Sequence, residues 1–136
     1  MAPDINKWAK IVSHFLKPDG DFIIADFHPF VWTLDNNFEK IHYSYFHKDD
    51  PIKDVIKGTY ADRDSDIEMA EYGWNHSLSD IITSLLNQGL TIETFKEFPY
   101  SPYNCFPNMK EISNGKFEFE KFPSVLPLVY LIKAKK

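Results

Sequence analysis

Four consecutive residues, Asp26-Phe27-His28-Pro29, place a carboxylate and an imidazole directly after an unbroken apolar run at residues 22–25. A run that does not alternate predicts a strand covered on both faces, as in the interior of a mostly parallel sheet. Ligands of open α/β sheets bind at the carboxyl ends of the strands. His28 is therefore the leading candidate to orient or deprotonate a ligand. The residues leave a second role open for each polar group: His28 can fix the turn with Pro29, and Asp26 can accept hydrogen bonds from nearby backbone amides.

Aromatic residues make up 16% of the chain, and many lie outside the predicted core elements. Trp32, Tyr72 and Trp74 are candidates for the walls of a substrate pocket, because such pockets are lined mainly by apolar and aromatic side chains. His76, directly before a predicted helix, is a fourth substrate-binding candidate. Ordinary packing is the alternative for the three aromatic residues, and a place beside a helix N-terminus is the alternative for His76.

Length and charge exclude several classes of function. The 136 residues are enough for one domain or part of one, and 15 basic against 20 acidic residues give a formal net charge of −5. No face of clustered lysine or arginine is evident, so nucleic acid is not an expected partner. The N-terminus has no apolar signal segment and no apolar run is long enough to span a bilayer, so we expect a cytoplasmic protein with no membrane partner.

A metal site and a cysteine nucleophile are not expected. His42 and His47 are an odd number of residues apart, so on a strand they would face opposite ways. Residues 62–66 (DRDSD) resemble the opening of a calcium loop but lack its glycine at the sixth position and its glutamate at the twelfth. Cys105 has no neighbouring base in sequence and lies in a proline-rich loop, which favours a packed thiol.

The elements that position these candidates begin with a helix. Asp4 can cap it, and apolar residues then recur at helical spacing up to Leu16. Residues 17–20 (KPDG) end the helix, because proline cannot continue it, and Gly20 is expected to take the positive φ of the turn. The predicted strand at residues 22–25 follows at once.

Residues 31–75 are predicted to form an antiparallel, aromatic-rich insertion. Side chains alternate at residues 41–46, and residues 55–61 and 68–75 are two further extended segments. The positions of Trp32, Tyr72 and Trp74 fall within this insertion.

A second helix-then-strand unit follows the insertion. Residues 77–80 (SLSD) have the form of a capping box, and Gly89 closes the predicted helix before a strand at residues 90–98. Asn114-Gly115 predicts a two-residue hairpin. The apolar residues 125–134 predict a last strand, in which Pro127 indicates an edge or a bulge.

The opening helix predicts a partial domain. A helix that leads into a buried parallel strand normally crosses over from an earlier strand, and only three residues precede Asp4. We therefore expect a truncated domain; a self-contained fold that starts with a helix is the alternative.

Several of these segments resemble class I S-adenosylmethionine-dependent methyltransferases of the small-molecule type. Residues 16–20 (LKPDG), followed by an apolar strand, resemble the LKPGG turn and fifth strand of that family, with Asp19 in place of the commoner glycine. Further similarity to a subgroup acting on small molecules is carried by Trp8, residues 28–30 (HPF), 76–80 (HSLSD), 89–92 (GLTI) and Glu97. The family's chain continues after this strand as helix, strand, strand, with the last strand antiparallel, which matches the predicted order and covers nearly the whole sequence.

The resemblance implies an α/β fold that forms the C-terminal half of a Rossmann-like methyltransferase sheet: α-β, an antiparallel insertion, then α-β-β with an antiparallel last strand. It implies S-adenosylmethionine as the cofactor of the intact fold and a small-molecule methyl acceptor. In this setting His28 is the candidate catalytic residue, and the candidates for acceptor contact are Trp32, Tyr72, Trp74 and His76.

The sequence departs from the family at the cofactor site. The family holds its cofactor on a glycine-rich turn after the first strand. The glycines of this chain are too far apart to form one: Gly20, Gly58, Gly73, Gly89 and Gly115. No cofactor-binding residue is therefore assigned, and we expect the chain alone to be inactive and to form homo-oligomers through its exposed sheet or helix surface. A non-catalytic domain that binds a small ligand or a partner protein is the alternative.

Overall fold

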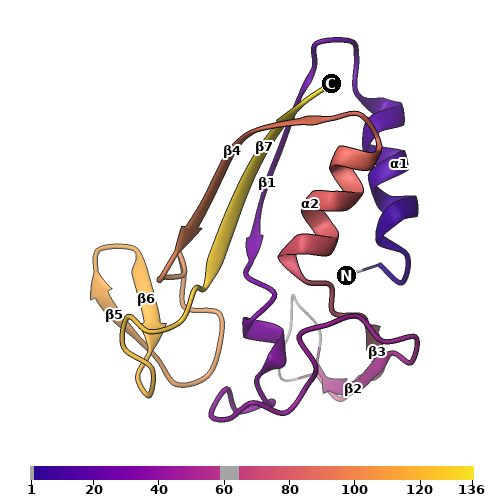
Figure 1. The fold of residues 1–136 in the computed structure, drawn as a ribbon. Coiled ribbons are helices and arrows are strands. Elements are labelled where there is room, and N and C mark those ends of the chain that lie inside the picture. The colour runs from indigo at the N-terminus through magenta and orange to yellow at the C-terminus, as the bar shows by residue number, and fades with distance from the viewer. Residues whose placement is uncertain (1, 59–64) are drawn as a thin grey trace.

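The computed structural model describes residues 2–58 and 65–136 of the chain. It is a mixed α/β structure in which two helices lie on one face of a three-stranded sheet, and two hairpins extend from one end of that sheet (Figure 1). The elements follow in the order α1 (Ile5–Phe15), β1 (Asp21–Phe27), the 3₁₀ helix η1 (Val31–Thr33), β2 (Ile52–Lys57), β3 (Glu68–Gly73), α2 (Leu78–Asn87), β4 (Thr91–Phe98), β5 (Met109–Ser113), β6 (Lys116–Phe119) and β7 (Val129–Lys135).

Both helices begin at the predicted caps. The Asp4 carboxylate accepts from the backbone N–H groups of Asn6 and Lys7, each at 2.9 Å. Ser77 and Asp80 form the predicted capping box, in which each side chain accepts from the backbone N–H of the other residue. Gly89 follows α2 with a φ of 80°, the conformation expected of a residue just past a helix end.

In the turn between α1 and β1, the positive φ is found at a different residue from the predicted one. Asp19 has a φ of 58°, and Gly20 is not among the residues with positive φ. Gly20 is required for a different reason: a Cβ there would lie 2.8 Å from the carbonyl oxygen of Lys17, to which the Gly20 N–H donates at 2.9 Å. The glycine therefore permits close backbone approach rather than an unusual dihedral angle.

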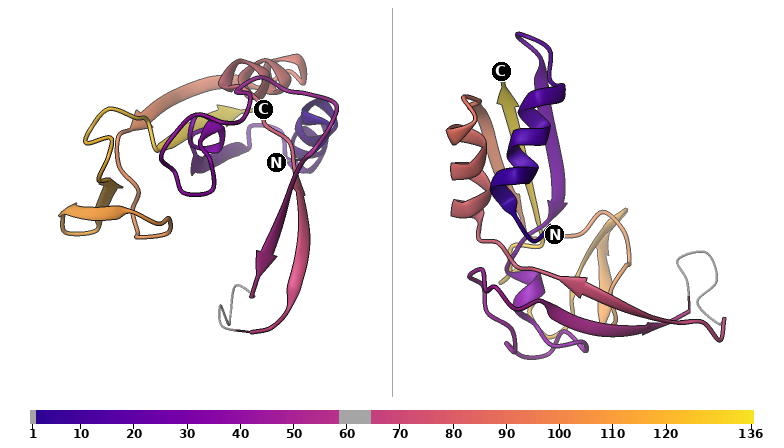
Figure 2. Two further views of the ribbon diagram at one scale, coloured as in Figure 1. Left: turned by 90° about the horizontal axis from the view of Figure 1, so that it is seen from below. Right: turned by 90° about the vertical axis from the view of Figure 1, so that its right-hand side faces the viewer.

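The three-stranded sheet has the order β1-β7-β4, and β7 runs antiparallel to both neighbours. The prediction that residues 22–25 form an interior strand covered on both faces is wrong for the described part of the chain. β1 is an edge strand whose pairing is antiparallel, and its exposure alternates: Ile24 packs on the helices, whereas Ile23 is 61% exposed. The reason is that both helices cover the same face of the sheet (Figure 2). On the other face of β1 Ile23 and Ala25 are exposed, and Phe27, at the strand's end, packs against Trp32 of η1 and against Phe106.

The prediction for Pro127 is also wrong. β7 begins at Val129, beyond the proline, and it is the central strand rather than an edge. The irregularity in this sheet lies instead in β4, between Ile92 and Thr94.

One hairpin agrees with the sequence in full and the other in part. β5 and β6 are joined through Asn114-Gly115, with Gly115 at a φ of 70°. β2 and β3 pair antiparallel, as expected for the segment between β1 and α2. Residues 41–46 form no strand, however, and pair only through a single bridge between Ile41 and Leu34; residues 59–61 of the predicted segment 55–61 lie outside the described residues.

Two apolar clusters hold the structure. The larger lies between the helices and the sheet and contains fully buried side chains from α2 and β7, including Ile81, Leu85, Tyr130 and Ile132. The smaller joins η1 to the β5–β6 hairpin through Val31 and Phe119. Across residues 2–58 and 65–136, no helix is long and apolar enough to cross a membrane.

The close approach at Gly20 can be tested by comparison with another glycine. We expect Gly20→Ala to lower the free energy of unfolding by about 1–3 kcal/mol, because the added methyl group collides with fixed backbone. Gly73→Ala is the control, since a Cβ there meets nothing within 4 Å, and its stability should change by less than about 1 kcal/mol. Urea unfolding measures both; equal losses at the two sites would show that crowding at Gly20 does not limit stability.

Candidate functional site

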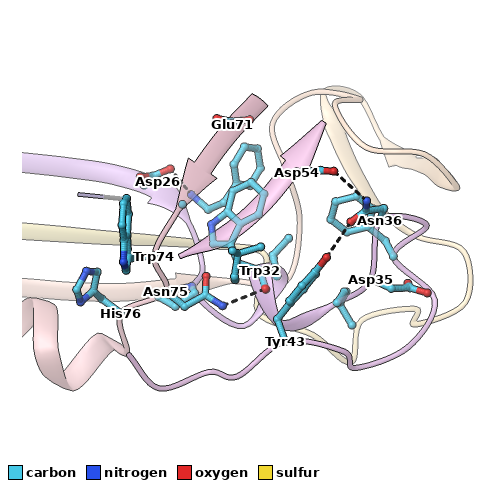
Figure 3. Close-up of a pocket in the computed structure, with 17 residues that line it drawn as sticks. Asp26, Trp32, Asp35, Asn36, Tyr43, Asp54, Glu71, Trp74, Asn75 and His76 are labelled. Atoms are coloured by element: carbon cyan, nitrogen blue, oxygen red, sulfur yellow. Dashed lines mark hydrogen bonds between the residues drawn. The ribbon is translucent and has the colours of Figure 1, made fainter. Parts of the chain in front are cut away.

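A pocket of about 400 Å³ opens at the carboxyl end of β1, where η1 and the β2–β3 hairpin meet (Figure 3). Its walls come from the end of β1, from η1 and the loop that follows, and from the inner face of the hairpin. The lining residues are Asp26, Phe27, Pro29, Val31, Trp32, Leu34, Asp35, Asn36, Phe38, Tyr43, Ile52, Asp54, Glu71, Gly73, Trp74, Asn75 and His76.

Two tryptophans form part of this wall, and hydrogen bonds hold their segments in place. The indole N–H of Trp74 donates to the carbonyl oxygen of Asp49 at 3.1 Å. The amide of Asn75 donates to the carbonyl oxygens of Trp32, at 3.2 Å, and of Ser44, at 2.7 Å. Asn75 thereby fixes the end of β3 against η1, which sets the position of Trp32 relative to Trp74.

Four carboxylates also line the pocket: Asp26, Asp35, Asp54 and Glu71. Asn36 orients one of them, since its amide donates to Asp54 at 3.3 Å while its oxygen accepts from the hydroxyl of Tyr43 at 3.4 Å (Figure 3). A hydrogen bond from the backbone N–H of Glu39 is the main cause that lowers the pKa of Asp35. The backbone N–H and the charge of Lys40 add smaller effects in the same direction, so Asp35 is ionised at neutral pH.

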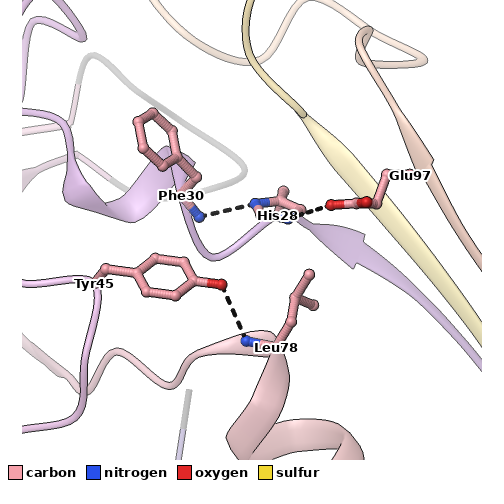
Figure 4. A network of polar contacts seen from close by, with 5 residues as sticks. All are labelled: His28, Phe30, Tyr45, Leu78 and Glu97. Atoms are coloured by element: carbon pink, nitrogen blue, oxygen red, sulfur yellow. Dashed lines mark hydrogen bonds and ion pairs between the residues drawn. The ribbon is translucent and has the colours of Figure 1, made fainter.

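His28 lies beside the pocket rather than in its wall. Its ring Nε2 is 2.9 Å from Glu97 Oε1 on β4, and its Nδ1 accepts from the backbone N–H of Phe30 at 3.0 Å (Figure 4). Because Nδ1 accepts, the ring proton of the neutral form lies on Nε2 and is donated to Glu97. Both ring nitrogens are thus engaged, and the side chain joins the end of β1 to the end of β4. This geometry favours the turn-fixing role that the sequence left open; a catalytic role for His28 stays a prediction.

Burial lowers the pKa of His28 by more than the hydrogen bond and charge of Glu97 raise it. His28 is only 5% exposed, so the neutral ring is the form that the fold accommodates at neutral pH.

His76 lies at the pocket's edge, before α2. Its Nε2 is 2.8 Å from the carbonyl oxygen of Ala2, to which it donates, and its ring stacks on that of His47 at 4.5 Å between centroids. Burial is the main cause that lowers the pKa of His76, and His47 adds to the effect. His76 therefore brings no positive charge to the pocket at neutral pH.

The structure brings three of the predicted contact residues together and places one elsewhere. Trp32, Trp74 and His76 line the same pocket. Tyr72 does not line it, because side chains alternate along β3 and place Tyr72 on the face opposite Glu71 and Gly73; its ring is 52% exposed, with the Lys53 ammonium 5.8 Å from its centroid. Asp26 lines the pocket and also accepts from the backbone N–H of Phe27 at 2.7 Å.

Sequence reasoning missed other polar residues near the site. Asn36, Asp54 and Asn75 carry no motif and could be found only once the hairpin was folded against η1. Tyr130 was predicted only as part of an apolar strand, yet its fully buried hydroxyl finds no hydrogen-bond partner in the part of the chain that the structure describes. Burial and the charge of Asp26, its neighbour in the β1–β7 register, raise the pKa of Tyr130, so the hydroxyl keeps its proton.

No group of three or more histidine, cysteine or acidic side chains with the geometry of a metal site occurs within residues 2–58 and 65–136. Asp62 and Asp64 of the calcium-like segment lie outside those ranges. Cys105 is half-buried against the smaller apolar cluster, with its Sγ 3.6 Å from the hydroxyl of Ser101.

Comparison with known proteins gives a match in structure only. No protein-family model matches the sequence, and no curated protein does. The structure is similar to that of a candidate S-adenosylmethionine dependent methyltransferase from Listeria monocytogenes, with a TM-score of 0.53, 20% sequence identity, and coverage of 98% of this chain and 55% of that chain. This chain has the fold of part of that methyltransferase.

A second structure, of an S-adenosylmethionine dependent methyltransferase from Mesorhizobium loti, matches with a TM-score of 0.48 and 12% identity, covering 98% of this chain and 56% of that one. The chain spans about half the length of both structures. At the level of the fold, the resemblance to methyltransferases predicted from residues such as 16–20 is confirmed.

The neutral, buried state of His28 predicts a pH dependence of stability. The unfolded chain protonates this histidine below its ordinary pKa of about 6.5, whereas the folded protein resists protonation until the pH is lower. The contribution is therefore complete above about pH 6.5 and is lost as the pH falls towards the lowered pKa. Urea unfolding between pH 7 and 5.5 should show a falling free energy of unfolding.

The variant His28→Gln, which can still donate to Glu97, should reduce the slope of unfolding free energy against pH in this interval. His14→Gln, on the exposed side of α1, is the control and should leave the slope unchanged. A slope in His28→Gln equal to that of the unaltered protein would contradict the assigned burial effect.

Proposed function

We propose that this chain contributes the acceptor side of the active site of an S-adenosylmethionine-dependent methyltransferase that acts on a small molecule. The observation that carries the proposal is the position of the pocket: it opens at the carboxyl end of β1, within a fold shared with part of a methyltransferase. A volume of about 400 Å³ suits a small organic molecule.

The described residues do not fit the cofactor itself. The described glycines lie in the turn before β1, in or beside the hairpins and after α2, and none belongs to a glycine-rich turn from a sheet strand into a helix. The N-termini of α1 and α2 already carry the carboxylates of Asp4 and Asp80, which disfavour the carboxylate of S-adenosylmethionine at either position. We therefore propose that the cofactor is held by a second unit corresponding to the part of the Listeria structure that this chain does not cover, and that this chain alone is inactive.

Within such an enzyme the role of this chain is positional. Methyl transfer requires the acceptor to be held in line with the methyl group, and holding two reactants in place removes much of the entropic barrier. Trp32 and Trp74 would confine the acceptor, and the carboxylates would orient it by charge and hydrogen bonds. The His28–Glu97 pair fixes the ends of β1 and β4, and with them the position of Asp26 at the pocket wall.

One observation favours the alternative function, a non-catalytic domain that binds a small ligand. The pocket is built entirely from residues of this chain, so ligand binding needs no second unit. The two functions differ in whether methyl transfer follows when a cofactor-binding unit is supplied.

Calorimetry and a fusion protein test the proposal. S-adenosylmethionine titrated into the chain alone should give no tight one-to-one binding. A fusion that joins the part of the Listeria protein that this chain does not cover to this chain, before Asp4, should bind S-adenosylmethionine and transfer a labelled methyl group to small molecules. Trp74→Leu should weaken this transfer by raising KM. Tight binding by the chain alone would contradict the absence of a cofactor site, and a folded fusion that binds the cofactor but methylates nothing would favour the ligand-binding alternative.

The open face of the sheet supports a further proposal, association into homo-oligomers. β1 has an unpaired edge within the described structure, and Ile23 and Ala25 are exposed on the face away from the helices. Exposed edges and apolar faces favour association. The net charge of −5 and the absence of a basic face still argue against nucleic acid and anionic membrane surfaces as partners.

Light scattering at high protein concentration should therefore report a dimer or larger species. Ile23→Lys places a charge on the exposed face and should shift the protein towards monomer. Val125→Lys, at a 69% exposed position away from the sheet, is the control and should not. A monomer in the unaltered protein, or equal effects of the two substitutions, would contradict association through β1.

A further inference from the structure

The inner face of the β2–β3 hairpin carries two like charges directly opposite each other. Asp54 and Glu71 are partners in the antiparallel register, and both line the pocket. Like charges at directly opposed positions destabilise a hairpin. Glu71 forms no hydrogen bond or ion pair with any described residue, so no such contact of Glu71 offsets the destabilisation of the hairpin.

The rest of the pocket adds negative charge and no positive charge. Asp26 and Asp35 also line it, whereas lysine and arginine are absent from the lining that the structure describes. The charge of Lys40 stabilises the ionised form of Asp35. The other three carboxylates form no ion pair within residues 2–58 and 65–136: Asp26, Asp54 and Glu71. A concave site with one sign of charge and apolar walls concentrates ligands of the opposite charge.

The apolar part of the lining is rich in aromatic side chains and suits the same kind of ligand. Five of the lining residues are aromatic: Phe27, Trp32, Phe38, Tyr43 and Trp74. The face of an aromatic ring attracts alkylated ammonium groups, and tryptophan does so most strongly. Aromatic faces alone suit any apolar molecule, and carboxylates alone suit any cation; together they select a cation with an organic surface.

We propose that this pocket binds a small organic cation, an amine that is protonated at neutral pH, and that this is the chemical class of the methyl acceptor. Its nitrogen can accept a methyl group only after it has released a proton, which Asp54 or Glu71 would take. The carbon–sulfur bond of the methyl donor would break as the nitrogen–carbon bond forms, which leaves a neutral thioether. The acceptor role rests on the function proposed above, whereas the binding of the cation does not. Asp54 and Glu71 would lie on either side of the charged group, and Trp32 and Trp74 would contact its alkyl surface.

Choline and 3,3-dimethyl-1-butanol provide the test, because they have nearly the same shape and differ in charge. Titration of the full chain, followed by heteronuclear NMR or calorimetry, should show choline binding about tenfold or more tightly than the neutral alcohol. The backbone signals that move should be those of the pocket lining. Equal affinities, no choline binding, or shifts outside the pocket would overturn the proposal.

Matched substitutions locate the contribution of each wall. Glu71→Gln should weaken choline binding about threefold or more while leaving the melting temperature equal or higher, because it removes the like-charge pair. Glu68→Gln, exposed on the same strand and outside the pocket, makes the same change in net charge and should have no effect on binding. Trp74→Leu should weaken binding about fivefold or more, and Tyr72→Leu, on the opposite face of β3, should not.

S-adenosylmethionine, itself a cation, is the competing occupant. It should not displace choline from the chain alone; displacement at the same pocket would assign the charge to the methyl donor and overturn the assignment to the acceptor. If the chain does not bind choline but the fusion still transfers methyl groups, only the assignment of the acceptor to the class of organic cations is wrong. Choline binding together with a fusion that methylates nothing would remove the methyltransferase proposal and leave the cation site in place.

Discussion

The sheet depends on β7, because β1 and β4 do not pair with each other in the described structure and each forms its backbone pairing with β7. The last strand of the chain therefore completes pairing that begins at residue 21, more than a hundred residues earlier. Its buried side chains, Tyr130, Ile132 and Ala134, form the floor on which both helices pack. Both helices contribute to the same apolar cluster as β7, so helix packing and strand insertion are expected to occur together.

The site follows from this arrangement through a small number of polar contacts. Insertion of β7 sets the separation of β1 and β4, and the His28–Glu97 hydrogen bond then joins their ends across it. Asn75 fixes the hairpin to η1 in a similar way. The pocket thus has one side formed by the end of the sheet and one side formed by a two-stranded hairpin with few buried side chains. Differences in free energy between ligands are expected to arise mainly on the hairpin side, where Asp54 and Glu71 lie and which Trp74 follows.

Local signals in the sequence predicted local structure well. Asp4 and the Ser77–Asp80 pair identified both helix starts, and Asn114-Gly115 identified a hairpin. Motifs such as residues 16–20 (LKPDG), combined with the order of helices and strands, indicated the methyltransferase-like fold. The caps and the hairpin turn each depend on residues within a few positions of one another. This is why capping and turn chemistry can be read from one sequence without knowledge of tertiary contacts.

The errors occurred where distant contacts decide the outcome. An apolar run at residues 22–25 gives no information on whether a second layer covers it, so the edge position of β1 could not be inferred. Alternation at residues 41–46 is equally compatible with a strand and with a loop packed on η1, and the structure has the loop. Asn36 and Asp54 reach the pocket from separate segments and have no recognisable spacing. Tyr72 lies within β3 on its outer face, whereas Trp74 follows the end of that strand, where alternation no longer decides its direction.

The described residues of the pocket wall all lie between Asp26 and His76, in the segment that begins at the end of β1 and ends just before α2. Within the described structure, β4, β7 and both α-helices contribute no residue to the wall. The specificity of the site is accordingly determined by one contiguous segment of the chain. Two proteins with the same sheet could exchange ligand preference by exchanging this segment. The sheet could then stay the same while the ligands differ.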